Sequence, residues 1–371
     1  MSASSRNNLS ILLYPFSLLY GLITYIRNLL YDYDIIKSNE FPIPIISVGN
    51  ITAGGTGKTP HVEYLVRLLK DEFNVAVLSR GYKRKTRHFI LAGPTSGVPD
   101  IGDEPVQIKQ KFPDVHVAVD RKRVNGVQQL MEKIPDLDVV LLDDAYQHRR
   151  IKPGMSILLI DFNRPIVKDR LLPVGLLREK AYEKRRADII LVTKCPDRLK
   201  PIERRLIVKD TDLKAFQHLY FTRLGYREPV PIFLETGPKI NFSKIKSTSP
   251  TILMVAGIAY PRIFKEHLRS ISSGIKEMTF PDHHSFSQRD IKNILHVYHN
   301  MEGLDRFIFT TEKDAMRLKK FVNIEQEVKT RMFYIPVETE FLNEDTENFN
   351  KQILKYVTNN KRHSILHKKP D

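Results

Sequence analysis

The sequence predicts an α/β protein built on mainly parallel sheets, and three observations lead to this fold class. From residue 43 to about 194, short runs of valine, isoleucine and leucine alternate with helical stretches. Continuous apolar runs, as opposed to alternating ones, are typical of strands buried on both faces of a parallel sheet. A glycine-dense turn joins the first run to an amphipathic helix, and a second strand–glycine–helix unit begins at Thr251. We therefore expect a doubly wound α/β domain followed by a smaller α/β domain.

The expected strands of the first domain are short apolar runs, at 44–48, 75–78, 115–119, 139–142, 157–160 and 189–193. In the second domain we expect strands at 251–257, 306–310 and 332–337, with helices at 289–300 and 313–319 between them. The predicted division is an N-terminal helix over 1–34, a nucleotide-binding domain over 35–222, a proline- and serine-rich linker over 223–250, a smaller domain over 251–340 and a basic, loosely ordered tail over 341–371.

The composition is that of a globular protein in a reducing compartment. With 42% hydrophobic residues the chain can bury substantial cores, which excludes global disorder. The single cysteine, Cys195, excludes a disulfide framework and favours a cytoplasmic location. A formal net charge of +16 indicates an anionic partner, which is a nucleic acid, a phosphorylated substrate or an acidic membrane surface.

Residues 9–30 are apolar and aromatic almost throughout. Their apolar side chains form a stripe at helical spacing, at Leu12, Phe16, Leu19, Ile23, Ile26 and Leu30. Pro15, Gly21 and Arg27 interrupt the run, whose length is borderline for the roughly 20 residues of a membrane span. No small-residue cleavage site follows, so we expect a helix that lies in or dips into a membrane interface, and no signal peptide. An ordinary core helix is the alternative.

A strand, a glycine-rich loop and a helix follow one another over residues 45–69, which is the context that a phosphate-binding P-loop requires. The glycines allow backbone N–H groups to turn toward phosphate oxygens, and the helix N-terminus adds its positive dipole end. Lys58 is expected to reach the β- and γ-phosphates of ATP, and the Thr59 hydroxyl to bind Mg²⁺. The expected nucleotide-binding residues are Thr52, Ala53, Gly54, Gly55, Thr56, Gly57, Lys58 and Thr59. Because Thr52 stands where the usual pattern has glycine, a β–α turn with an incidental lysine is the alternative.

Two adjacent carboxylates, Asp143 and Asp144, follow the apolar run at 139–142. In P-loop proteins an acid at the end of such a strand holds Mg²⁺ directly or through water. Sites of α/β proteins form at the carboxyl ends of strands, which favours the metal role over capping of the next turn. Which of the two contacts the metal directly is left open.

Two further segments carry candidate ligands. The loop that starts at Asp169 ends in Arg178, a side chain suited to clamping phosphate oxygens, and Glu179, which can join a metal shell. Lys194 follows a strand, at a place where nucleotide-binding folds often put a lysine against the base.

Other polar clusters are ambiguous by themselves. Asp103 and Glu104 stand between a glycine and a proline, a pattern more typical of helix capping. His283 and its neighbour His284 either bind a metal or lie exposed. The basic run over 83–88 is either a solvated face or a contact for phosphate or anionic headgroups.

In this order, these segments resemble one family, the tetraacyldisaccharide 4′-kinases of lipid A biosynthesis. The segments that carry the resemblance are 47–50, 54–60, 79–82, 102–105, 143–149, 172–179, 280–284 and 310–315, and the likeness extends from the N-terminal helix to about residue 337. Ala145 and Tyr146 stand where the family usually has Gly-Phe, and Lys83 stands where it has glycine, so the loop near the sugar differs.

The resemblance implies two α/β/α domains of the P-loop or Rossmann-like type, joined by a two-stranded linker. It implies that Asp103 activates the 4′-hydroxyl of the sugar with His283 as its partner. The catalytic set implied is Asp103, His283, Lys58 and Arg178. The implied metal ligands are Thr59, Asp143, Asp144 and Glu179, and the implied substrate contacts are Tyr82, Glu104 and Arg121.

The expected function is ATP- and Mg²⁺-dependent phosphorylation of the 4′-hydroxyl of a tetraacylated glucosamine disaccharide 1-phosphate, at the cytoplasmic face of the inner membrane. The expected partners are this lipid and an anionic membrane surface, without nucleic acid, and the oligomeric state is not predicted. The rival is a basic P-loop ATPase that binds nucleic acid, but helicase-like and RNA-binding motifs are missing from the sequence. A scaffold with an inactive P-loop is disfavoured because Lys58, Thr59 and both aspartates are present.

Overall fold

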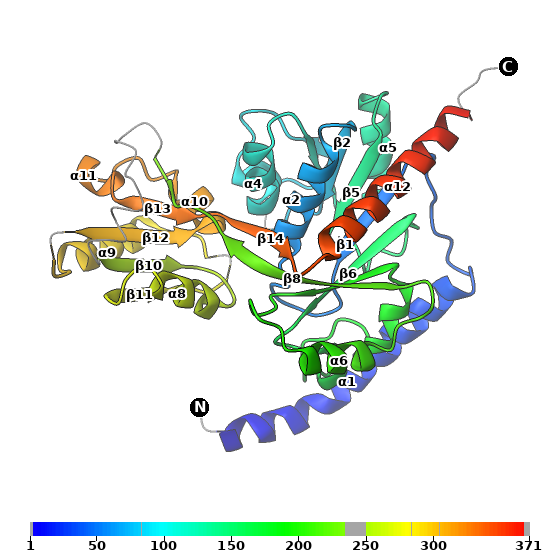
Figure 1. Ribbon diagram of the computed structural model, residues 1–371, viewed down its shortest axis with the longest axis horizontal. Helices are drawn as coiled ribbons and strands as arrows, with labels where there is room; N and C mark the ends of the chain where they lie inside the picture. Colours follow the sequence, from blue (N-terminus) through cyan, green and yellow to red (C-terminus); the bar gives the residue numbers. More distant parts are fainter. Residues whose placement is uncertain (1–2, 83, 234–249, 283, 304, 367–371) are drawn as a thin grey trace.

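A computed structural model describes residues 3–82, 84–233, 250–282, 284–303 and 305–366 of the chain. It is an α/β protein with two mixed, mostly parallel sheets, which confirms the predicted class. In Figure 1 the larger sheet with its helices lies to the right and the smaller sheet to the left.

The first sheet has nine strands in the order β14-β8-β7-β6-β1-β5-β2-β4-β3. Their bounds are β1 Ile45–Gly49, β2 Val75–Ser79, β3 Ile90–Leu91, β4 His116–Val119, β5 Val139–Asp143, β6 Met155–Asp161, β7 Ile189–Thr193, β8 His218–Tyr226 and β14 Val337–Phe341. Pairing is parallel except at the two edges, where β3 joins β4 and β14 joins β8 in antiparallel fashion. Every residue of β1, β2, β5, β6 and β7 is buried, as expected for strands covered on both faces.

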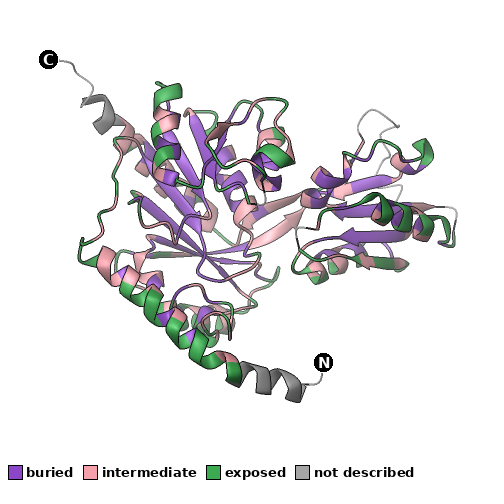
Figure 2. Cartoon of the chain, turned by 180° about the vertical axis from the view of Figure 1, so that it is seen from behind, coloured by how far each residue is buried: buried purple, intermediate pink, exposed green. Residues whose placement is uncertain are grey.

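The second sheet has five strands in the order β11-β10-β12-β13-β9. Their bounds are β9 Val230–Pro231, β10 Thr251–Ala256, β11 Ile275–Thr279, β12 Arg306–Thr311 and β13 Met332–Ile335. Only the short β9 pairs antiparallel. The purple strands in Figure 2 show that both sheets form the buried centre of their halves of the molecule.

Helices connect the strands and cover the sheets. They are α1 Ala3–Asp32, α2 Lys58–Leu69, α3 Val98–Ile101, α4 Asp103–Lys111, α5 Arg123–Lys133, α6 Pro201–Thr211, α8 Pro261–Arg269, α9 Gln288–His299, α10 Glu312–Leu318, α11 Gln326–Lys329 and α12 Asp345–Leu366, with 3₁₀ turns η1 Ile166–Lys168 and η2 Ala181–Arg186.

The chain leaves the first sheet through β8 and returns to it through β14, and these two strands pair over five residues. The expectation of a loosely ordered tail is wrong over residues 345–366. Residues 345–366 form α12, whose Phe349, Ile353 and Val357 are buried in the core of the first sheet. Their spacing of four residues places all three on one helix face, which packs while the basic face stays outside.

Helix α1 lies along the outside of the first sheet's domain (Figure 1). Its apolar stripe faces away from the protein. Large apolar side chains on it keep about half or more of their surface exposed, namely Leu12, Phe16, Leu18, Leu19, Leu22, Ile23 and Ile26. Figure 2 shows this outer face in green. The thin polar face packs instead, with Ser17 and Asn28 buried, so the core-helix alternative is wrong. Among the described residues, no helix is long and apolar enough to span a membrane.

Candidate functional site

The glycine-rich loop between β1 and α2 is held in shape by its own side chains. Gly54 and Gly57 have φ of 103° and 88°, a backbone region that favours glycine. The Asn50 amide donates to Thr56 Oγ1 at 2.9 Å and to the Gly54 carbonyl at 3.4 Å. Thr193 Oγ1, at the end of β7, donates to the Thr56 carbonyl at 2.9 Å. Hydrogen bonds within the protein therefore hold the loop in this shape.

Helix α2 begins at Lys58, and among the described residues no side chain caps its N-terminus at Gly57. The first N–H groups of a helix have no partner within the helix and carry the positive end of the dipole. Together with the Lys58 ammonium they form a place suited to phosphate oxygens.

Asp143 and Asp144 stand at the end of β5, beside β1 in the sheet. The Lys58 ammonium lies 3.5 Å from Asp144 Oδ1, and the Arg178 guanidinium lies 3.3 Å from the same atom. Burial alone would raise the pKa of Asp144, but Lys58 and Arg178 outweigh it and hold that pKa below its usual range. In this structure the Asp144 carboxylate therefore pairs with both Lys58 and Arg178, the two cations that are expected to bind phosphate.

Asp143 is buried more deeply than Asp144. Ser79 Oγ donates to its Oδ2 at 3.1 Å, whereas its buried Oδ1 has no hydrogen-bond partner among the described residues. Burial, with the nearby charges of Glu104 and Asp144, raises the pKa of Asp143 to about 7.

An unpartnered carboxylate oxygen beside a phosphate-binding loop fits a hard divalent cation such as Mg²⁺. Within the described parts of the chain, no group of three or more histidine, cysteine, aspartate or glutamate side chains could hold a metal alone. A cation here would take further ligands from phosphate and water, which Mg²⁺ accepts readily.

Lys194 and residues that the sequence did not single out surround the other side of the loop. The Lys194 ammonium donates to the Gly55 carbonyl and forms an ion pair with Asp161 at 2.7 Å. Arg164 donates to the Ala53 carbonyl at 3.0 Å. Tyr260, from the second domain, lies with its ring 5.3 Å from the Lys194 ammonium and 5.0 Å from the Arg164 guanidinium carbon. The second domain therefore reaches the loop through Lys194 and Arg164.

Asp103 and Glu104 open α4 and face charged side chains of α10 in the second domain. The Arg317 guanidinium forms an ion pair with Asp103, and Lys313 lies 3.1 Å from Glu104. Both members of the Asp103–Arg317 pair are buried. The predicted partner His283 lies outside the described residues, so the Asp103–His283 pair stays a prediction.

Tyr82 and Arg121, the other predicted substrate contacts, are exposed. Tyr82 lies beside the start of α4, because a Cβ on Gly102 would be 3.0 Å from the Tyr82 carbonyl. Arg121 follows β4, two residues after the end of a strand that pairs with β2.

The prediction that Glu179 is a metal ligand is not met in this structure. Its carboxylate is buried and paired with Arg27 of α1 at 2.6 Å and with Arg186 of η2. Asn28 donates to the same carboxylate at 3.3 Å. With both oxygens engaged, Glu179 does not join Asp143 and Asp144.

The sequence did not reveal the roles of Arg317, Lys313 and Asp314. The only signal was the place of Lys313 and Asp314 in the 310–315 segment, which the resemblance included without a role, and Arg317 lies beyond that segment. Ion pairs between α4 and α10 join residues more than 200 positions apart, and no local pattern predicts such pairs.

The family model described as tetraacyldisaccharide-1-P 4′-kinase (LpxK) matches residues 9–358. The chain belongs to the LpxK family. It is 46% identical over 354 residues to a tetraacyldisaccharide 4′-kinase of Phocaeicola vulgatus, covering 95% of this chain and 96% of that protein. It is 44% identical over 354 residues to one of Flavobacterium johnsoniae, covering 95% and 99%. The crystal structure of LpxK from Aquifex aeolicus in complex with ATP superposes with a TM-score of 0.71 at 29% identity, covering 94% of this chain and 99% of that one.

Proposed function

We propose that this chain is a tetraacyldisaccharide 4′-kinase of lipid A biosynthesis. It transfers the γ-phosphate of ATP to the 4′-hydroxyl of a tetraacylated glucosamine disaccharide 1-phosphate. The observation that carries the proposal is that Lys58, at the start of α2, lies 3.5 Å from Asp144, which with Asp143 ends the strand beside β1. The relatives named tetraacyldisaccharide 4′-kinase match this chain over almost its whole length.

Phosphoryl transfer depends mainly on positioning and on neutralising negative charge. Lys58 and Arg178 supply two cations within 3.5 Å of one carboxylate, and incoming phosphate oxygens would compete with Asp144 for them. Thr59, Asp143 and Asp144 are the residues that would hold Mg²⁺. When bound, Mg²⁺ neutralises charge on the phosphates. Lys194, whose ammonium contacts the loop at the Gly55 carbonyl, is proposed as a contact for the base of ATP.

Asp103 is proposed as the base that accepts the proton of the 4′-hydroxyl as the new bond to phosphorus forms. Its position at the first turn of α4, fixed by Arg317, puts the carboxylate at the contact between the domains. His283 is proposed as its partner, and Tyr82, Glu104 and Arg121 as contacts for the sugar and its phosphate.

The lipid reaches the enzyme from the membrane. The outward apolar face of α1 and the net charge of +16 suit a protein that rests on an anionic bilayer, at the cytoplasmic face of the inner membrane. A groove of about 380 Å³ opens beside α1, lined by apolar residues such as Leu18, Leu22 and Leu171 and by the cations Arg170 and Lys180.

Mass spectrometry of the disaccharide lipid incubated with enzyme, with and without ATP, tests this function. One added phosphate that depends on ATP and is lost in Lys58→Ala is the expected result. ATP hydrolysis stimulated by DNA or RNA, with an unchanged lipid, would instead support the nucleic-acid-binding ATPase.

A further inference from the structure

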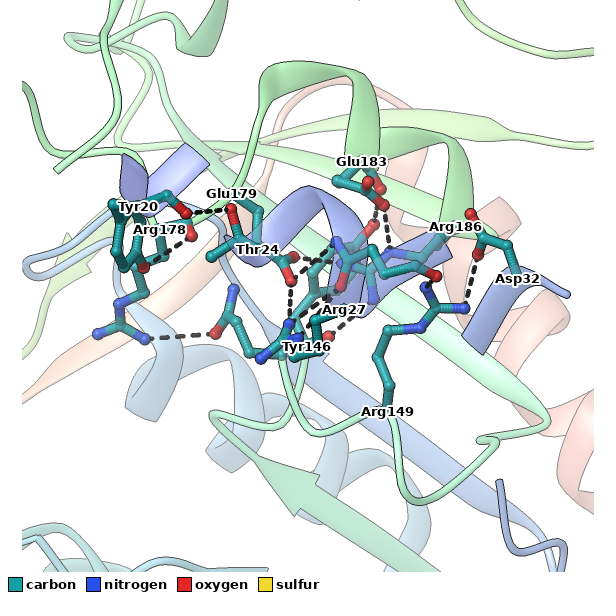
Figure 3. A network of polar contacts seen from close by, with 12 residues as sticks. Tyr20, Thr24, Arg27, Asp32, Tyr146, Arg149, Arg178, Glu179, Glu183 and Arg186 are labelled. Atoms are coloured by element: carbon teal, nitrogen blue, oxygen red, sulfur yellow. Dashed lines mark hydrogen bonds and ion pairs between the residues drawn. The ribbon is translucent and has the colours of Figure 1, made fainter. Parts of the chain in front are cut away.

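The inner, polar face of α1 binds the segment that ends in Arg178 and Glu179. Ser17 Oγ donates to the Leu171 carbonyl at 2.9 Å, and Tyr20 Oη donates to the Arg178 carbonyl at 2.9 Å. About two helical turns after Tyr20, Arg27 contacts the Glu179 carboxylate at 2.6 Å. Figure 3 shows Tyr20 and Arg27 of α1 beside Arg178, Glu179 and Arg186.

The same segment is joined to the phosphate-binding loop. The Ala53 N–H donates to the Leu176 carbonyl at 2.6 Å, and the Arg178 N–H donates to the Ile51 carbonyl at 2.7 Å. Arg178 then extends its guanidinium to Asp144 at 3.3 Å. A single stretch of backbone therefore contacts α1 on one side and the nucleotide loop on the other.

Glu179 fixes this stretch more firmly than an exposed carboxylate could. Its side chain is 1% exposed and has arginine partners on two elements, Arg27 on α1 and Arg186 on η2. A buried carboxylate that loses a cationic partner is strongly disfavoured, so Glu179 moves unless both arginines stay in place. Because Glu179 follows Arg178 directly, a movement of Glu179 changes where the Arg178 guanidinium lies.

We infer that Arg27 and Asn28 are positioning residues: through Glu179 they set the place of Arg178 at the phosphate site, so that α1 controls phosphate transfer as well as membrane contact. This inference rests on the proposed kinase function for the role of Arg178. It separates the two faces of α1, because the outward face meets lipid while the inward face acts on the rate of transfer.

The test compares Arg27→Ala with Thr24→Ala in mixed micelles at saturating lipid and MgATP. Thr24 is a matched control on the same helix, since its hydroxyl binds only the Tyr20 and Gly21 carbonyls of α1 itself in the described structure. A misplaced Arg178 should lower kcat roughly 10- to 100-fold in Arg27→Ala. Its KM for lipid and its flotation with liposomes should stay unchanged, and Thr24→Ala should behave as wild type. Asn28→Ala, which acts on the same carboxylate, should lower kcat in the same direction.

A double-mutant cycle separates positioning from a general loss of structure. If Arg27 acts through Arg178, Arg27→Ala adds no further loss in an Arg178→Ala background. A kcat within twofold of wild type, or losses that multiply in the double variant, would overturn the inference.

MgATP affinity, measured by calorimetry, provides a readout that does not require turnover. Arg27→Ala and Arg178→Ala should weaken it by the same factor, and Arg27→Lys should recover most of the loss. An unchanged affinity in Arg27→Ala beside a weakened one in Arg178→Ala contradicts the inference. A wild-type enzyme that binds MgATP without phosphorylating the lipid would refute only the kinase assignment.

Discussion

The chain contains two strand–glycine–helix units that share a backbone plan and differ in charge. In the first unit, β1 leads through the glycine-rich loop to α2, and Lys58 stands at the helix start. In the second, β10 leads through Gly257 to α8, and no lysine occupies the turn. There the Gly257 N–H donates to Asp314 Oδ2 at 2.8 Å.

The two units therefore differ in the source of the anion at their glycine turn: in the second unit it is a side chain of the protein, and in the first it is the phosphate of a ligand. In the second unit, Asp314 already provides the negative charge next to the glycine turn. Asp314 also holds Arg317 at 3.0 Å, and Arg317 reaches across to Asp103. The glycine turn of the second unit thus stabilises the contact between the domains, whereas the loop of the first unit can bind phosphate.

The largest expected effect comes from removing the cation that distinguishes the first unit. Lys58→Ala should lower kcat/KM by about 10³-fold or more, because charge on the transferred phosphate loses its compensation. The value of kcat/KM is measured from the transfer of radiolabelled phosphate from ATP to the lipid. Arg262→Ala, at the start of α8 in the second unit, is the matched control and should leave activity unchanged. Comparable losses in both variants would remove the distinction between the units.

Next comes the proposed base at the contact between the domains. Asp103→Ala and His283→Ala should each lower kcat by roughly 10²–10⁴-fold, with little change in ATP affinity. A helix cap alone would cost only about 0.5–2 kcal/mol of stability and would leave turnover almost intact. If the two residues act as a unit, the double variant is about as slow as the slower single one. Fully multiplicative losses would show that they act separately.

A smaller effect is expected from the carboxylate that fills the second unit. Asp314→Ala leaves Arg317 buried without one of its acidic partners, which should lower the free energy of unfolding by about 3–5 kcal/mol. Misplacement of Asp103 should lower kcat about 10- to 100-fold. Thermal unfolding and steady-state kinetics below the transition measure the two effects. Asp314→Asn keeps an acceptor for the Gly257 N–H, so a loss equal to that of Asp314→Ala identifies the charge as the essential feature.

The mildest test uses pH. The pKa of Asp143 is raised to about 7, and a protonated carboxyl does not bind Mg²⁺ well. Mg²⁺ affinity in the presence of a nonhydrolysable ATP analogue should be full above pH 7 and fall about tenfold for each pH unit below it. Asp143→Asn should remove this dependence. A flat profile in the wild type would argue against Asp143 as a ligand.

Sequence patterns predicted the features whose determinants are contiguous in the chain. The fully buried strands β1, β2, β5, β6 and β7 were placed correctly because continuous apolar runs mark strands covered on both faces. The glycine loop was predicted because its determinants are contiguous. By contrast, β11 was missed because Lys276 and Glu277 break any apolar run on this edge strand.

Contacts between distant segments could not be predicted. Glu179 was expected at the metal because a glutamate next to the phosphate-clamping Arg178 can join a metal shell, yet Arg27 and Arg186 form ion pairs with its carboxylate in the folded chain. Likewise the residue that meets Asp103 in the described structure comes from α10, 214 positions later in the sequence. Helix α12 was taken for a tail because of the basic residues near its end, at 361–363 and 368–369, although three buried apolar residues decide its packing.

The placement of α12 has a consequence for biosynthesis. A nascent chain emerging from the ribosome has completed every strand of the nucleotide-binding sheet except β14 well before α12 is made. Until then, Phe349, Ile353 and Val357 are missing from the core. The apolar surface around Tyr64 and Tyr220, which they cover in the folded chain, remains exposed to solvent. The inserted second domain is therefore able to fold first, and the core of the nucleotide-binding half is completed only once α12 has been synthesised. Premature termination between β13 and the end of α12 would release a protein whose hydrophobic core is exposed on one side. Chaperones and proteases would bind such a protein.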